Sequence, residues 1–314
     1  MSCQKSSNRL FLLLIPCLMF LLVSCQSGPA EPEGQCTVTF SVSNYRQVSF
    51  DDLSSSGMSR AEKIYMTLAN LSLTVFDAET NKQVISTILH KSVDYEASST
   101  LAKTYSKFSV SLPYGRYRVL VLGYNGSRAC NITSLNHISW EENYVPNTFL
   151  YCEEFTLDES TNLNRDITLR HVVSAFCVTA EDAIPANLKK MRFSSTAGGT
   201  VLDATTGFTP QSTGRTSEIA VPADSIGKQN VRFTAYLFLP EEQITTNYTI
   251  QALDKNNAVF CEKHFNDVPL RINYLTEWHG KAFEQGEVET PDAQSSFNIS
   301  WDINWADTLR LNGE

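Results

Sequence analysis

Residues 108–124 have the sequence FSVSLPYGRYRVLVLGY, and this stretch decides the fold class. Apolar and polar side chains alternate before Pro113, and a more apolar run follows Gly115. A period of two is typical of a strand with one buried face, and a Pro-x-Gly sequence between two such runs is typical of a tight turn. The stretch therefore predicts a β-hairpin.

The same period continues on both sides of this hairpin. Between the strands we expect a long loop over 126–146 and a short helical turn over 182–190. Many short strands with few helical segments predict an all-β fold of two tandem β-sandwich domains, 35–160 and 165–314, separated by the polar segment 158–164. The further strands are predicted at 37–42, 71–76, 84–88, 149–157, 166–178, 191–195, 231–239, 248–253, 258–260, 270–275 and 297–301.

Composition excludes several classes of protein. Of the 314 residues, 42% are hydrophobic and 19% are charged, which is the balance of a globular chain rather than of a disordered chain or a coiled coil. Only residues 10–22 are continuously apolar, so a membrane protein with several spanning helices is excluded. The net charge is −9 without any basic, aromatic-rich run, so we expect no nucleic-acid partner.

The N-terminus resembles that of a bacterial lipoprotein. Lys5 and Arg9 precede the apolar run at 10–22, which is typical of a secretory signal peptide. The following Leu22-Val-Ser-Cys25 resembles a lipobox, in which the peptidase cuts after a small residue and the cysteine thiol carries the lipid. We predict a signal peptide at 1–24, cleavage between Ser24 and Cys25, and lipid attachment (palmitate among the acyl chains) at Cys25. The alternative is an ordinary signal peptide with an incidental cysteine.

Residues 25–34 are rich in Gly, Pro and Glu and predict a flexible, lipidated tether of about 30 Å when extended. Two acyl chains already give stable anchoring, and a lipidated cysteine usually carries three. Gln26 is not the Asp that retains lipoproteins at the inner membrane in enteric bacteria. We therefore expect an outer-membrane lipoprotein at the cell surface.

Cysteine usage leaves the disulfide pattern open. Removing the signal peptide and assigning Cys25 to the lipid leaves an odd number of cysteines, so at least one stays free. Cys177 and Cys261 lie in apolar strands, where a buried free thiol is the common outcome. Cys130 and Cys152 flank the expected long loop and are the best candidates for a disulfide.

No catalytic or metal-binding motif stands out. The histidines are scattered, and Cys261-x-x-His264 is only half of a metal site. Nucleophile elbows, phosphate loops and dinucleotide fingerprints are absent from the sequence. Trp278, Trp301 and Trp305 could form a sugar platform, but core packing is the more common role. We therefore expect no enzyme, no metal, no cofactor beyond the covalent lipid and no small-molecule substrate.

Three groups of stretches resemble one known family. They are 71–77 with 112–125, 169–178 with 184–185, and 272–283 with 297–302 and Trp305. In this order they resemble the fimbrial anchor and subunit lipoproteins of the Bacteroidales, the fimbrillin superfamily. The resemblance implies two transthyretin-like β-sandwich domains and a non-enzymatic role, in cell adhesion, in a surface fimbrium (pilus).

Within that family the chain is more similar to the membrane anchors. A stalk subunit would lose its lipidated first strand by cleavage after a basic residue, for which Arg46 and Arg60 are the candidates. We expect an anchor or minor subunit that binds neighbouring fimbrial subunits by β-strand addition, at an edge near 270–275 or 297–301 of the C-terminal domain. The alternatives are a polymerising stalk or tip subunit, and a surface glycan-binding lipoprotein.

Overall fold

The stretch at 108–124 forms two strands, but they are not a hairpin. In the computed structural model, β4 (Lys107–Leu112) pairs with β1 (Cys36–Arg46), whereas β5 (Gly115–Tyr124) pairs with β2 (Asn70–Asp77) and β8 (Thr148–Leu157). Both strands bury apolar side chains in the same core cluster, so Pro113 and Tyr114 link two facing layers instead of two hydrogen-bonded neighbours. The turn was predicted in the right place, and the pairing was wrong.

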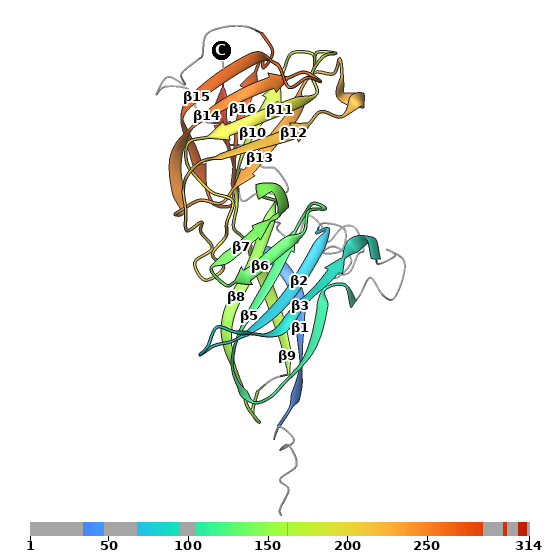
Figure 1. Ribbon diagram of the computed structural model, residues 1–314, viewed down its shortest axis with the longest axis vertical. Helices are drawn as coiled ribbons and strands as arrows, with labels where there is room; N and C mark the ends of the chain where they lie inside the picture. The colour runs from blue at the N-terminus through green and yellow to red at the C-terminus, as the bar shows by residue number, and fades with distance from the viewer. Residues whose placement is uncertain are drawn as a thin grey trace, which may run out of the picture. The chain divides into compact units, whose positions relative to one another are not determined.

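The structure describes residues 34–46, 68–94, 104–161, 163–284, 298–299 and 307–312. The fold of this part is all-β, as predicted (Figure 1). The remaining strands are β3 (Gln83–Lys91), β6 (Cys130–Ser134), β7 (His137–Trp140), β9 (Asn164–His171), β10 (Ser174–Ala180), β11 (Lys190–Ser195), β12 (Arg215–Ala220), β13 (Val231–Leu237), β14 (Gln243–Leu253), β15 (Val259–Arg271), β16 (Tyr274–Gly280), β17 (Asn298–Ile299) and β18 (Asp307–Asn312). Single helical turns lie at η1 (Ser92–Asp94), η3 (Glu141–Asn143) and η4 (Ala223–Ser225).

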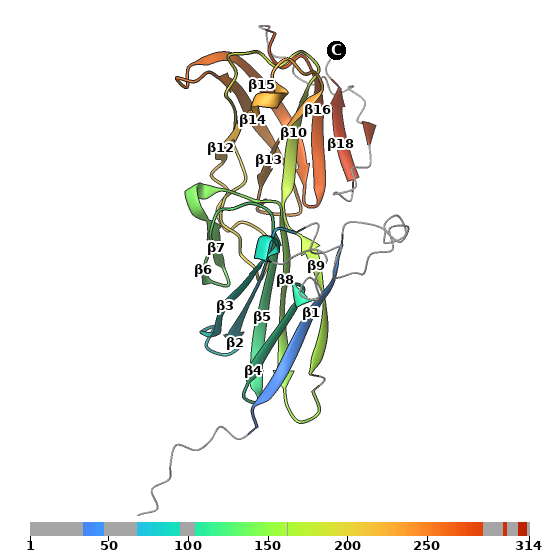
Figure 2. The same ribbon diagram turned by 90° about the vertical axis from the view of Figure 1, so that its right-hand side faces the viewer.

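The first sheet has seven strands, in the order β3-β2-β5-β8-β9-β1-β4 (Figure 2). Its two halves, β3-β2-β5-β8 and β9-β1-β4, are joined by only two residue pairs between β8 and β9. Alternate side chains from both halves fill one core cluster, which gives the sheet a sandwich-like construction. Strand β4 shows how a strand contributes one face to this core, since Phe108, Val110 and Leu112 are buried and the residues between them are exposed.

A second sandwich-like pair of sheets follows. One sheet has the order β13-β10-β16-β18-β17 and the other the order β12-β11-β14-β15. Their shared core contains side chains from six strands, among them Phe176, Phe193, Phe265 and Trp278. The predicted core role of Trp278 is confirmed, whereas Trp301 and Trp305 lie outside the described residues.

Strand β9 changes the predicted division of the chain. The second strand set was predicted to begin with a strand at 166–178, but most of the first half of that stretch belongs to β9, which pairs with β1 and β8 in the first sheet. The parallel pairing with β1 joins segments more than a hundred residues apart, and local periodicity carries no signal for such a contact. We propose two β-sandwich domains that meet at Val172 and Val173 instead of at 158–164. Their transthyretin-like topology remains a prediction.

Three local predictions were also wrong. The expected loop at 126–146 contains the β6–β7 hairpin, whose Ile138 and Trp140 are buried. Residues 182–190 form turns without a helix. The predicted strand at 270–275 is broken by a turn at Ile272 and Asn273, where Asn273 has a positive φ of 65°. No helix in the described ranges is long and apolar enough to cross a bilayer.

Candidate functional site

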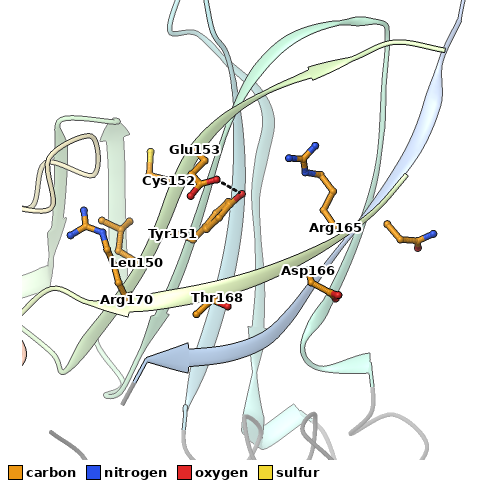
Figure 3. A pocket seen from close by; sticks show the side chains of 9 residues that line it. Leu150, Tyr151, Cys152, Glu153, Arg165, Asp166, Thr168 and Arg170 are labelled. Atoms are coloured by element: carbon orange, nitrogen blue, oxygen red, sulfur yellow. Dashed lines mark hydrogen bonds between the residues drawn. The ribbon is translucent and has the colours of Figure 1, made fainter. Parts of the chain in front are cut away.

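A groove lies where β8 and β9 separate. The two strands pair at Phe149 with His171 and at Leu150 with Arg170, and then diverge. The space between them has a volume of about 670 Å³ and is lined by residues of these two strands alone. Figure 3 shows Leu150 beside Arg170 at the paired end, with Tyr151 and Arg165 farther along on either side of the opening.

The backbone of β8 presents an unpaired edge to this groove. The Val172 amide donates to the Thr148 carbonyl (3.1 Å), and the Thr161 hydroxyl donates to the Thr156 carbonyl (3.2 Å). Even-numbered residues of β8 therefore direct their backbone groups away from β5. Because an antiparallel strand alternates the direction of its hydrogen-bonding groups, Cys152 and Glu154 direct theirs into the groove.

The facing edge of β9 has the same character. The Thr39 amide donates to the Leu163 carbonyl (2.7 Å), and the Ser43 hydroxyl donates to the Ile167 carbonyl (3.3 Å). Odd-numbered residues of β9 thus bond to β1, and even-numbered residues such as Asp166 and Thr168 face β8. Neither edge is paired with a strand of the described part of the chain beyond the two residue pairs at the closed end.

The side chains around the groove carry balanced charge. Glu153 and Asp166 are the acids, and Arg165 and Arg170 are the bases. The Tyr151 hydroxyl donates to Glu153 Oε2 at 3.1 Å, and burial raises the pKa of Tyr151 to about 12, so it stays a neutral donor. These groups can hydrogen-bond a polar ligand without favouring one sign of charge.

Two further contacts fix the arginines of this groove. The guanidinium of Arg165 lies 5.1 Å from the Phe155 ring centre, within the range of a cation–π contact. Arg170 Nη2 donates to the Thr206 carbonyl at 3.1 Å. Both arginines are therefore partly held in place before any ligand binds.

The predicted disulfide between Cys130 and Cys152 is not formed. Both thiols are free; Cys130 is the first residue of β6 and Cys152 lies in β8. Burial raises the pKa of Cys130 to about 12 and that of Cys152 to about 11, so neither is a reactive thiolate near neutral pH. Cys177 and Cys261 are buried free thiols, as predicted.

Glu277 is a buried carboxylate outside the groove. It accepts a hydrogen bond from Thr179 (2.7 Å) and forms an ion pair with Arg232 (3.2 Å). Burial opposes its charge, but these partners lower its pKa overall. In the ranges that the structure describes, no three side chains of the metal-ligating types converge.

Of the remaining predicted site residues, the structure describes only Arg46, which is the last residue of β1. Ser24, Cys25 and Arg60 lie outside the described residues. The groove itself was missed by the sequence analysis, which assigned strand 149–157 correctly but put the following strand in the other domain. The sequence signal at this place is two adjacent strands joined by a short polar turn. That signal predicts a hairpin paired along its whole length and not a groove between the two strands.

A family comparison covers nearly the whole described chain. Residues 33–310 match the model of DUF6562, a family of unknown function. The chain belongs to this family. No curated protein matches the DUF6562 chain at a significant level.

Solved structures from the Bacteroidales include neighbours of this DUF6562 protein. A candidate adhesin of Bacteroides ovatus has a TM-score of 0.45 at 13% identity, with coverage of 73% of this chain and 77% of the other. The fimbrial anchor protein Mfa2 of Porphyromonas gingivalis has a TM-score of 0.33 at 15% identity, with coverage of 72% and 82%. The tip fimbrial protein Mfa3 of that organism has 0.34 at 12%, with 73% and 82%. Fimbrial proteins are thus among the neighbours.

Proposed function

We propose that this protein is a non-enzymatic lipoprotein of the outer membrane that anchors, or forms a minor subunit of, a surface fimbrium. The lipid on Cys25 holds it to the membrane. A neighbouring subunit binds by adding a β-strand, and the β8–β9 groove is the acceptor. The sequence resemblance supports the fimbrial role, and the lipobox supports the anchor.

The unpaired edges of β8 and β9 carry this proposal. An exposed strand edge is a template for pairing with another chain, and proteins usually cover or shorten such edges. Here two edges face one groove, so an inserted strand could pair on both sides. Strand addition takes its affinity from backbone hydrogen bonds, which the even-numbered residues of both strands supply.

A specific observation also favours the stalk role as a second candidate. Strand β1 ends at Arg46 and lies between β9 and β4. Cleavage after Arg46 would therefore release the whole of β1 and open a gap with an unpaired strand on each side. Peptide mass spectrometry of the protein from intact fimbriae separates the two roles, since an anchor keeps residues 25–46 and a processed stalk subunit begins after Arg46.

The anchor itself is tested at Cys25. We expect Cys25→Ala to abolish lipid attachment, because only the thiol can form the thioether, and to release the chain from membranes or leave the precursor uncleaved. Palmitate labelling and membrane fractionation measure this. A variant that is processed and labelled like the wild type would contradict the lipoprotein assignment.

The acceptor groove is tested with proline. Thr168→Pro removes an amide that faces the groove and leaves the β1–β9 hydrogen bonds of the odd-numbered residues in place. The matched control is Ser109→Pro in β4, the strand at the other end of the β9-β1-β4 half. Because the Val42 amide bonds to the Ser106 carbonyl, odd-numbered residues of β4 such as Ser109 face outward.

We expect Thr168→Pro to shed fimbriae into the medium while the lipoprotein stays in the membrane, and Ser109→Pro to retain them. Melting temperatures of both variants control for unfolding. Normal retention in a folded Thr168→Pro variant would contradict binding at this groove. Normal fimbriae in a deletion strain, together with polysaccharide binding by the purified protein, would favour the glycan-binding alternative.

A further inference from the structure

A second groove, with a volume of about 680 Å³, lies beside β12 and β13. It is lined by the whole of β12, by Thr234–Tyr236 of β13 and by the segment 142–145. Strand β12 ends the four-stranded sheet and β13 ends the five-stranded sheet. Within the described residues, each of these strands has a ladder partner on one side only.

The hydrogen bonds of both strands show which backbone groups point outward. The Val221 amide donates to the Lys189 carbonyl (2.9 Å), so odd-numbered residues at β12 bond to β11 and Thr216 and Glu218 face outward. The Tyr236 carbonyl accepts a hydrogen bond from Arg215 Nη1, so it points away from β10. An extended ligand could therefore find backbone donors and acceptors along β12.

Arg215 is the unusual side chain of this groove. Its Nη1 donates to the Tyr236 carbonyl, but its Nε is shielded from solvent and has no hydrogen-bond partner. Burial lowers the pKa of Arg215 to about 10, and no carboxylate contributes to that shift. A guanidinium has five N–H donors, and leaving one buried without a partner is costly.

The acidic side chains of the groove are already paired with other bases. Glu142 forms an ion pair with Arg128. Glu218 forms ion pairs with Lys190 (2.9 Å) and Arg192 (2.8 Å). Among the described residues, none offers Arg215 a carboxylate, so the positive charge of the groove is not neutralised from within.

We infer that this groove binds a carboxylate side chain carried by an extended peptide segment of a partner protein, and that Arg215 recognises it. The planar guanidinium matches a carboxylate through paired hydrogen bonds, and the ionic component strengthens them. The edge of β12 favours a peptide over a compact ligand, because an added strand can use its outward backbone groups.

The inference rests on the proposed function only for the identity of the partner, a fimbrial subunit. Its test uses the mature lipoprotein purified in detergent, without fimbriae. Failure of the test would therefore leave the fimbrial role and the β8–β9 groove standing, and loss of the fimbrial role would leave the test valid.

The probe is the capped tripeptide acetyl-Val-Asp-Val-amide, and the control probe has Asn in place of Asp. At ten times its dissociation constant, the Asp peptide should raise the melting temperature by about 2–4 °C. The Asn peptide should give no shift, because it lacks the charge that Arg215 would pair with. Galacturonate, a sugar carboxylate, should give a smaller shift because it lacks a peptide backbone.

Two variants assign the effect to Arg215. Arg215→Met should melt no lower than the wild type without ligand, because it removes an unpaired, partly buried charge, and it should show no response to the Asp peptide. Arg128→Met is the matched control, since Arg128 lines the same groove but is paired with Glu142; it should keep the response. Arg215→Lys keeps the charge without the fork and should respond less.

Three results would overturn the inference. One is the absence of any shift with the Asp peptide up to its solubility limit. The second is an equal shift with the Asn peptide or in Arg215→Met. The third is an equal or larger shift with galacturonate, which would assign the groove to acidic sugars.

Discussion

The two grooves arise in the same way but offer different chemistry. Each lies where the end strand of one layer faces the end strand of the other. At β8–β9 the layers are still joined by two residue pairs, and two acids balance two arginines. At β12–β13 no ladder joins the layers, and Arg215 lacks an acidic partner among the described residues. The first groove therefore favours a strand that pairs through its backbone, and the second favours a strand that carries a carboxylate.

The two halves of the chain that carry these grooves are not independent. Each has its own core cluster, but a third cluster contains side chains from both, including Phe76 and Leu120 from the first half and Val173, Phe238 and Leu275 from the second. The residues from Gly34 onward form one compact unit. Whether the two grooves can be studied separately therefore depends on how strongly the unfolding of one half is coupled to that of the other.

The largest expected effect comes from truncating one core aromatic in each half. Phe176 contacts the rings of Phe193, Tyr248 and Phe265, and Phe40 makes an edge contact with Phe155. Each Phe→Ala change should lower the free energy of unfolding by about 3–5 kcal/mol, with Phe176→Ala at the upper end because it loses more ring contacts.

Calorimetry then measures the coupling. The shared cluster predicts one unfolding transition that either variant shifts as a whole. Two separate transitions, of which each variant moves only one, would show that the halves unfold independently and that each groove can be studied in isolation.

A pH effect at His171 should be the next largest. The ring lies at the end of β9 and contacts Asn147 Oδ1 and, at 2.8 Å, Asn273 Oδ1. Burial lowers its pKa to about 3, so the unfolded chain, with a pKa near 6.5, binds a proton first as the pH falls. The stability that the neutral ring contributes is fully present above pH 6.5 and is lost as the pH falls toward 3, at about 1.4 kcal/mol per pH unit.

Denaturant unfolding between pH 6.5 and pH 4.5 checks this dependence. His171→Gln should show a shallower pH slope than the wild type, by about that amount. His137→Gln, at an exposed histidine, is the matched control. Equal slopes in all three proteins would contradict a buried, neutral His171 ring in the folded protein.

The smallest effect is expected at Glu218 on the rim of the second groove. Its ion pairs with Lys190 and Arg192 lie in partly exposed surroundings, where solvent screens them. Glu218→Gln should lower the free energy of unfolding by less than about 1 kcal/mol, and the difference should shrink in high salt. A larger loss that persists in high salt would mean that the groove is drier than the exposure of these side chains indicates.

Local alternation was enough to place most strands. For example, 149–157 and the turn between 248–253 and 258–260 correspond closely to β8 and to the β14–β15 hairpin. Each of these elements depends on a period of two and on nearby turn residues. Strand β12 was missed because its sequence, RTSEIA, has few apolar side chains and only one half-buried face.

Pairing could not be predicted in the same way. The partners of β1 are β4 and β9, far along the chain, and the partners of β10 include the parallel strand β16. Both grooves depend on where such neighbours stop pairing, which is set by the packing of two layers and not by the strands alone. Arg215 was missed for the same reason, because an arginine without a partner is visible only once its neighbours are placed.

The central claim is that a neighbouring subunit inserts a strand between β8 and β9. Its most direct test is photo-crosslinking on intact cells, with a photoreactive phenylalanine analogue in place of Thr168 and, as the control, in place of Ser109. The account predicts a crosslink between this protein and a fimbrial subunit from position 168 and none from position 109. Crosslinks from position 109 alone, or from neither position in cells that bear attached fimbriae, would contradict it.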